Sequence, residues 1–358
     1  MEKKVLKWMT NCLLVLTLIA CTGMFFVPLI KNSIEAMASK NPTENVTEQT
    51  ESQVVTEESE ESETIKETES EVVVVTNDLD IQLPASIKAK DIKIENDYTN
   101  NIVYVYFENV DKDFSESQVT KGDCEYISKI SYSVKNEKGV LKVQLSKPCE
   151  HDYKIKDGHL YIDLEDVHDV YDKIVVIDAG HGGNDPGAVR KDIYEDTINL
   201  QIVKKIKALF DKEDEKKVKV FYTRIEDKFV ELEDRVKLAN NLQADVFVSI
   251  HNNSQGEDEF NEYNGTMVLY SDRNTKKSKT LAQLCLDSVV SEAGSKSQGL
   301  VKGDYVYIVR ASKVPVALIE VGFMTNEQEL ANLASSSYQK KVAQGVYDAI
   351  MEFLEGGE

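Results

Sequence analysis

Hydrophobic positions in residues 172–358 form two alternating patterns, short continuous apolar runs and longer segments with helical spacing. The run Ile174–Ile177 is apolar at every position, which is typical of a strand buried on both faces. In Thr197–Phe210 the apolar residues recur every three or four positions, as on one side of a helix. Further strands are expected at 218–223, 246–250, 266–270 and 316–319, and further helices at 232–242, 278–291 and 338–354. Strands that alternate with helices predict an α/β fold with a helix-covered, largely parallel twisted sheet.

A different pattern precedes this region. Between residues 83 and 170 apolar and polar positions alternate with period two, as in Leu141, Val143 and Leu145. Asp157-Gly158 separates two such runs and is typical of a two-residue hairpin turn. We therefore expect a small all-β domain, an antiparallel sandwich or meander, over residues 83–170. Cys124 and Cys149 both lie in this domain. The sequence is compatible with a disulfide between them and with two free thiols.

The amino-terminal segment has the features of an export signal. Three lysines within the first seven residues precede an uncharged, mainly apolar run at residues 12–30. As a helix this run is about 28 Å long, close to the thickness of a bilayer's hydrocarbon core. The preceding charges predict that the start stays inside and the rest is exported. Residues 1–38 are therefore a permanent signal anchor or a signal peptide cleaved after Ala38, with lipoprotein cleavage before Cys21 a weaker alternative. Either way we expect an extracytoplasmic protein, in the cell wall or anchored at the cell surface.

The charge is distributed unevenly. The chain is 41% hydrophobic and 29% charged, with a formal net charge of −21. Thirteen acidic residues and one base lie between residues 41 and 80, so more than half of the excess falls in this short stretch. Its Glu/Ser/Thr composition predicts a disordered acidic linker over residues 39–82. The remainder carries no basic stripe for a phosphate backbone, which argues against nucleic acid as a partner.

Four residues suited to metal hydrolysis lie at or beyond the ends of predicted elements. His181, His251 and Glu320 each follow a predicted buried strand, and Glu195 opens the first helix. Because parallel strands bring their carboxyl ends to one edge of a sheet, we expect these side chains to converge. Two imidazoles and one carboxylate are the open ligand set of a catalytic zinc site. Taken singly, His181 also fits a simple turn residue and Glu195 a helix-dipole role, and the pattern alone assigns no substrate.

Six sequence blocks resemble zinc-dependent N-acetylmuramoyl-L-alanine amidases. They occur in the family's order and span essentially all of residues 173–356: Val176–Ala188, Glu195–Leu200, Thr223–Asp227, Leu232–Asn240, Ser249–Asn253 and Ile319–Asn326. By this resemblance His181, Glu195 and His251 bind Zn²⁺, and Glu320 is the catalytic carboxylate. The family pattern also includes Arg224 and Arg235, which we interpret as structural ion pairs.

The resemblance implies a peptidoglycan hydrolase with its zinc amidase domain at residues 172–358. Its expected reaction is cleavage of the amide bond between N-acetylmuramic acid and the L-alanine of the stem peptide. A zinc peptidase that cuts within the stem peptide and a non-catalytic wall-binding protein are the alternatives. The β domain is similar to AMIN domains, which bind the cell wall, although a generic spacer domain fits the same pattern.

Regulation is less defined by the sequence. Some relatives carry a long helical insert after the second histidine that blocks the zinc. Here only residues 252–264 separate His251 from Gly265, so we expect no such autoinhibition. A protein activator is not assigned by the sequence, and neither are the oligomeric state and the physiological role.

Overall fold

The computed structural model describes residues 77–356, except for 111–113, 256–258, 272 and 274–275. The expected signal segment at residues 1–38 and most of the expected linker lie outside these residues. Among the helices that the structure describes, none is both long and apolar enough to cross a bilayer.

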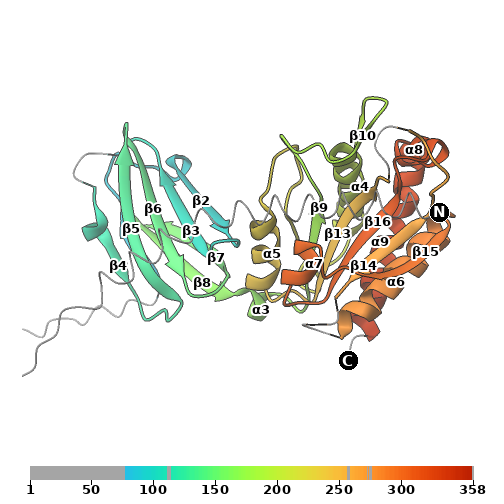
Figure 1. Ribbon diagram of the computed structural model, residues 1–358. Coiled ribbons are helices and arrows are strands. Elements are labelled where there is room, and N and C mark those ends of the chain that lie inside the picture. The colour runs from blue at the N-terminus through green and yellow to red at the C-terminus, as the bar shows by residue number, and fades with distance from the viewer. Residues whose placement is uncertain (1–76, 111–113, 256–258, 272, 274–275, 357–358) are drawn as a thin grey trace, which may run out of the picture. The chain divides into compact units, whose positions relative to one another are not determined.

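Two four-stranded antiparallel sheets form the amino-terminal β domain (Figure 1). The strand order of the first sheet is β4 (Val119–Lys121), β1 (Leu79–Gln82), β8 (His159–Asp166) and β7 (Cys149–Lys156). The strand order of the second sheet is β2 (Ile92–Asp97), β3 (Ile102–Phe107), β6 (Lys138–Leu145) and β5 (Ile127–Lys135). In β1, β3, β6 and β8 one residue in two enters a core to which both sheets contribute, which makes the domain a sandwich. Short 3₁₀ turns lie at Ala89–Asp91 and Glu116–Gln118. The expected domain boundary was too late, because β1 begins at Leu79 and pairs with β8 and β4.

Both cysteines of the β domain are buried in this shared core as free thiols. Burial raises the pKa of the Cys149 thiol to about 12. At neutral pH this thiol is therefore protonated and a poor nucleophile.

A six-stranded sheet forms the centre of the α/β domain. Its order is β12 (Lys219–Tyr222), β9 (Ile174–Ala179), β13 (Val246–Asn253), β16 (Val316–Phe323), β14 (Thr266–Tyr270) and β15 (Ser297–Lys302). The first four strands are mutually parallel, which confirms the largely parallel sheet. β14 is antiparallel to β16 and β15 is parallel to β14. The reversal follows from the β13–β14 connection, whose described residues form no helix to carry the chain back across the sheet.

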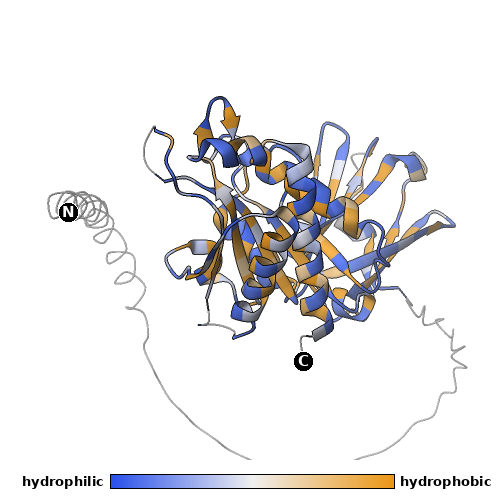
Figure 2. Cartoon of the chain, turned by 90° about the vertical axis from the view of Figure 1, so that its right-hand side faces the viewer, coloured by the Kyte–Doolittle hydropathy of each residue, from blue (hydrophilic) through white to orange (hydrophobic). Residues whose placement is uncertain are grey.

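Helices cover both faces of this sheet (Figure 1). On one face lie α4 (Glu195–Phe210), α6 (Lys277–Ala293) and α9 (Ser336–Gly356), and on the other lie α5 (Leu232–Asn241) and α7 (Tyr307–Ala311). The strand residues alternate between these two cores: Val175 and Ile177 face the first, whereas Ile174 and Val176 face the second. In Figure 2 hydrophobic and hydrophilic residues alternate along the helices, as expected for helices that are partly exposed.

Several elements differ from the expected pattern. β13 and β16 run three and four residues further than expected, so His251 and Glu320 lie within the last residues of their strands instead of after them. Between residues 167 and 333 six short elements were not predicted. They are α3 (Val167–Val170), the two strands of a hairpin, β10 (Val189–Arg190) and β11 (Ile193–Tyr194), α8 (Glu327–Leu333), α7 and β15. The short helices and the hairpin are too brief to show a period, and β15 contains Ser, Gln and Gly in place of alternating apolar residues.

Candidate metal centre and active site

The loop after β9 places the first histidine in an unusual backbone conformation. His181 has a φ of 61°, in the left-handed region that non-glycine residues rarely adopt. Gly182 and Gly183 follow with φ values of 124° and 62°. A Cβ atom on the preceding Gly180 would lie only 2.2 Å from Cε1 of His251. The glycines therefore allow this loop to turn sharply and bring the two imidazole rings to a centroid separation of 4.9 Å.

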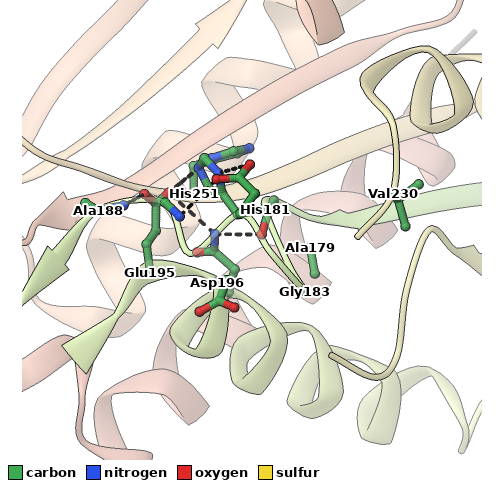
Figure 3. Close-up of polar contacts among 12 residues, drawn as sticks. Ala179, His181, Gly183, Ala188, Glu195, Asp196, Val230 and His251 are labelled. Carbon is green, nitrogen blue, oxygen red and sulfur yellow. Dashed lines mark hydrogen bonds and ion pairs between the residues drawn. The ribbon is translucent and has the colours of Figure 1, made fainter. Parts of the chain in front are cut away.

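Three of the four predicted site residues form a compact cluster (Figure 3). Glu195, the first residue of α4, lies with Oε1 3.2 Å from Nε2 of His181 and 3.1 Å from Nδ1 of His251. One ligand atom from each residue can be chosen so that all three lie within 4.8 Å of one another. Imidazole nitrogens and a carboxylate oxygen are ligands for divalent transition metals, so this cluster can hold a metal ion.

Neighbouring groups fix the orientation of these candidate ligands. Asp185 Oδ2 lies 2.8 Å from Nδ1 of His181, which leaves the other ring nitrogen directed at Glu195. A carboxylate on the distal nitrogen of a ligating histidine is a common supporting contact in metal sites. The second oxygen of Glu195, Oε2, accepts a hydrogen bond from the backbone N–H of Ala188 at 2.9 Å. Both oxygens of Glu195 are thus held in place, one toward the histidines and one toward the chain.

The electrostatics of the cluster favour a positive charge. Burial alone would lower the pKa of His181, but the hydrogen bonds and charges of Glu195 and Asp185 outweigh it and raise this pKa to about 9. Burial alone would raise the pKa of Glu195, but its contacts with His181 and His251 hold it well below its usual range. Glu195 is therefore an ionised carboxylate inside the domain, and it requires a cationic neighbour.

Glu320 lies beside this cluster on the next strand. It is in register with His251 across the parallel β13–β16 pair, and both side chains project from the α5/α7 face of the sheet. Its Oε2 atom is buried and has no hydrogen-bond partner among the residues that the structure describes. Burial raises the pKa of Glu320 to about 7, with Glu195 adding to the rise and the two histidines opposing it. A carboxyl group with such a pKa can both accept and release a proton near neutral pH.

The two arginines of the family pattern donate hydrogen bonds to the backbone of the His181 loop. Arg235 forms the expected ion pair with Asp178 (2.6 Å) and also donates to the carbonyl oxygens of Ala179 and His181 (2.7 and 2.8 Å). Arg224 has a different role from the one expected, because its guanidinium donates to main-chain carbonyl oxygens. The acceptors are those of Ala179, Gly180, Glu226 and Asp196.

Sequence reasoning brought the four site residues together but missed the groups that support them. Asp185, Asn199 and Asn252 each make a hydrogen bond to a cluster residue or to one of its neighbours. A signal was present for Asn199, which follows Glu195 by four residues and so lies on the same side of α4. The contacts of Asp185 and Asn252 depend on how loops and strands meet in three dimensions.

Comparisons with known proteins identify the family of the α/β domain. The N-acetylmuramoyl-L-alanine amidase family model (Amidase_3) matches residues 175–352. The uncharacterized protein YqiI of Bacillus subtilis is 35% identical over 184 residues, which cover 51% of this chain and 85% of YqiI. The amidase LytC of Bacillus subtilis is 30% identical over 51% of this chain, but the match spans only 36% of LytC.

Among solved structures, the catalytic domain of CwlV, an N-acetylmuramoyl-L-alanine amidase from Bacillus (Paenibacillus) polymyxa, is 38% identical. The match covers 51% of this chain and 98% of that domain, with a TM-score of 0.47. The chain thus belongs to the N-acetylmuramoyl-L-alanine amidase family, the peptidoglycan hydrolases that cleave the bond between N-acetylmuramic acid and L-alanine.

Proposed function

We propose that this chain is a zinc-dependent amidase in which His181, Glu195 and His251 hold Zn²⁺ and Glu320 is the catalytic carboxylate. Two imidazoles and a carboxylate leave a catalytic zinc ion an open coordination position. When bound, Zn²⁺ supplies a Lewis acid that polarises the scissile carbonyl and lowers the pKa of water. The observation that carries the proposal is the unpartnered, buried Oε2 atom of Glu320 beside the three ligands.

Glu320 manages the proton in this mechanism. A water molecule attacks the carbonyl carbon of the lactyl group, and Glu320 accepts the proton that the water releases. The carbon–nitrogen bond then breaks, and Glu320 delivers that proton to the departing amine of L-alanine. Without a bound cation the pKa of Glu320 is about 7. A cation held by the three ligands lowers this pKa, so at neutral pH the carboxylate is ionised and ready to accept the proton of the water.

The other residues of the site keep the ligands in place during this reaction. Asp185 holds the ring of His181 through Nδ1, and Ala188 N–H restrains the Oε2 atom of Glu195. Arg235 fixes the carbonyl of His181 and so supports its left-handed backbone. A ligand set held this firmly needs little rearrangement when substrate binds.

The test is digestion of purified peptidoglycan by the purified full-length protein, with and without a chelator. Mass spectrometry of the products should show whole stem peptides with L-alanine at the new amino terminus, and the chelator should abolish their release. Glu320→Gln should keep zinc and lose most turnover, whereas His251→Ala should lose both. Cuts inside the stem peptide would instead establish the zinc peptidase. Full activity in either variant would contradict the site assignment.

The β domain is proposed to bind the cell wall, as its similarity to AMIN domains implies. Tyr104 and Tyr106 project from the outer face of β3, since residues 103, 105 and 107 enter the core. Their rings are stacked at 5.9 Å between centroids with an interplanar angle of 23°. Such a platform offers sugar rings two nearly parallel aromatic surfaces. Replacing both with alanine should reduce co-sedimentation of the full chain with peptidoglycan, whereas alanine at the exposed Tyr153 of the other sheet serves as the control.

We also propose that residues 1–38 carry the protein out of the cytoplasm, because its substrate lies outside the cell membrane. Cell fractionation and amino-terminal sequencing of the native protein test this. An intact amino terminus in the membrane fraction indicates an anchor, and a new terminus at Ser39 indicates a cleaved signal peptide. Confinement to the cytoplasm would contradict export.

A further inference from the structure

A pair of buried asparagines lies directly behind the three proposed metal ligands. Asn199 is on α4, one helical turn after Glu195, and it is fully buried. Asn252 follows His251 on β13 and is 2% exposed. Neither side chain is assigned a role in the mechanism above. Burying an amide costs free energy unless its polar groups find partners. Among the described residues three of the four polar side-chain atoms of this pair have partners, and Oδ1 of Asn252 has none.

Hydrogen bonds from this pair reach all three segments that carry ligands. Asn199 Nδ2 donates to the carbonyl oxygen of Gly180, next to His181, at 3.2 Å and to Oε1 of Glu195 at 3.5 Å. Asn199 Oδ1 accepts from Nδ2 of Asn252 at 2.7 Å. The backbone N–H of Asn252 donates to the same Oε1 atom of Glu195 at 3.0 Å. The two residues therefore join β9, α4 and β13 at one point.

We propose that Asn199, held by Asn252, is a positioning residue that sets the spacing of the metal ligands. Its Nδ2 group links the backbone beside His181 to the carboxylate of Glu195, so a shift of either ligand breaks a hydrogen bond. The N–H groups of Asn199 and Asn252 approach Glu195 Oε1 together with the two histidines, which limits rotation of this carboxylate. Losing groups that orient ligands in this way typically weakens metal binding 10- to 100-fold.

A purely structural amide would behave differently, and the chain offers a matched control. Gln339 on α9 is also a buried amide, 1% exposed, and it donates to Oε1 of Gln201 and to the carbonyl oxygen of Leu333. It contacts none of the ligand residues in these hydrogen bonds. Changing either residue to leucine removes a buried amide of similar size, so both variants should lose stability. The proposal requires that only Asn199→Leu also weakens metal binding.

The experiment measures Zn²⁺ affinity of the full-length protein by competition with a chelating dye, together with urea unfolding of the metal-free protein. We expect Asn199→Leu to bind Zn²⁺ at least tenfold more weakly and Gln339→Leu to stay within twofold of the wild type. The Co²⁺-substituted Asn199→Leu protein should also show an altered visible spectrum, because the geometry of the ligands changes. Zn²⁺ affinity of Asn199→Leu within twofold of the wild type would overturn the proposal, and so would an equal loss in Gln339→Leu.

A milder variant covers the case in which Asn199→Leu does not fold. Asn252→Ala removes the group that holds Asn199 Oδ1 but leaves its backbone donor to Glu195, so a several-fold loss of affinity is expected. An unchanged affinity would contradict the role of the pair. This inference rests on the proposed metal-dependent function, and the two fail differently. A wild-type protein that binds no zinc refutes that function, whereas wild-type binding with unaffected variants refutes only the positioning role.

Discussion

Replacing the proposed catalytic carboxyl, that of Glu320, should make the protein inactive and, at neutral and alkaline pH, more stable. Glu320 has a pKa of about 7 in the folded chain, compared with an ordinary value of 4.5. On unfolding the group regains its ordinary pKa, so at neutral pH ionisation in water favours the unfolded state. The folded chain tolerates the protonated carboxyl, so the free energy of unfolding is highest when Glu320 is protonated. This contribution of Glu320 to stability is lost as the pH rises from 4.5 through 7. Glu320→Gln remains neutral throughout and avoids this loss.

The size of the effect follows from the pKa difference. Each tenfold change in an ionisation constant corresponds to about 1.4 kcal/mol, which gives an upper limit of about 3 kcal/mol for Glu320. Because part of the side chain remains accessible to solvent, a gain of about 1–3 kcal/mol is expected at pH 8. At pH 4.5 and below, where the carboxyl is largely protonated in the folded chain, the variant and the wild type should differ little.

Urea unfolding of the chelated proteins at pH 4.5, 6 and 8 measures this difference. Glu352→Gln, at an exposed position of α9, serves as the control and should show no pH-dependent gain. The same carboxyl should produce an acid limb in the pH profile of kcat/KM, since a general base must be ionised. A bound cation would move that limb below pH 7. Equal free energies of unfolding for Glu320→Gln and the wild type at pH 8 would refute the claim that the ionised carboxylate of Glu320 destabilises the fold.

Four further outcomes are expected. Asp185→Ala should weaken Zn²⁺ binding 10- to 100-fold by freeing the ring of His181, as measured by dye competition; an unchanged affinity would mean that the 2.8 Å contact is incidental. Gly180→Ala should lower both Zn²⁺ affinity and the thermal unfolding midpoint, because its Cβ would meet His251 at 2.2 Å, whereas Gly356→Ala, with open space around it, should change neither. Saturation with Zn²⁺ should stabilise the fold by about 4 kcal/mol when the free metal exceeds its Kd a thousandfold, and calorimetry without any shift would argue against a native metal site. The full chain should digest purified peptidoglycan without an added protein, because its described β13–β14 connection forms no blocking helix; a zinc-loaded but inactive protein would contradict this.

The sequence predicted the sheet and the convergence of the site, for a reason visible in its strands. Buried parallel strands have continuous apolar runs, and the residues near their carboxyl ends must meet at one edge, as His181, His251 and Glu320 do. The direction of β14 was not predictable in the same way. Its apolar run is compatible with either direction, and the outcome depends on whether a helix separates it from β13.

The contacts that support the site could not be predicted from the spacing of apolar and polar residues either. Asn252 and Asn199 are 53 residues apart in the chain, and their hydrogen bond exists only because β13 and α4 pack together. The Arg224 side chain illustrates the same limit. Its charge predicted an ion pair, but in the folded chain the guanidinium donates hydrogen bonds to the carbonyl oxygens of Ala179 and Gly180. The sequence does not show that these oxygens lie within its reach.

The reversed direction of β14 bears on how such a domain can diversify. Met267, its second residue, pairs with Glu320, so the connection between Asn253 and Thr266 starts and ends at the edge of the sheet where the proposed metal ligands lie. Residues added there would extend over the proposed catalytic groups without entering a strand or displacing a helix. A change in the length of this connection can therefore alter which substrates reach the carboxyl of Glu320, while the sheet and its helices stay the same.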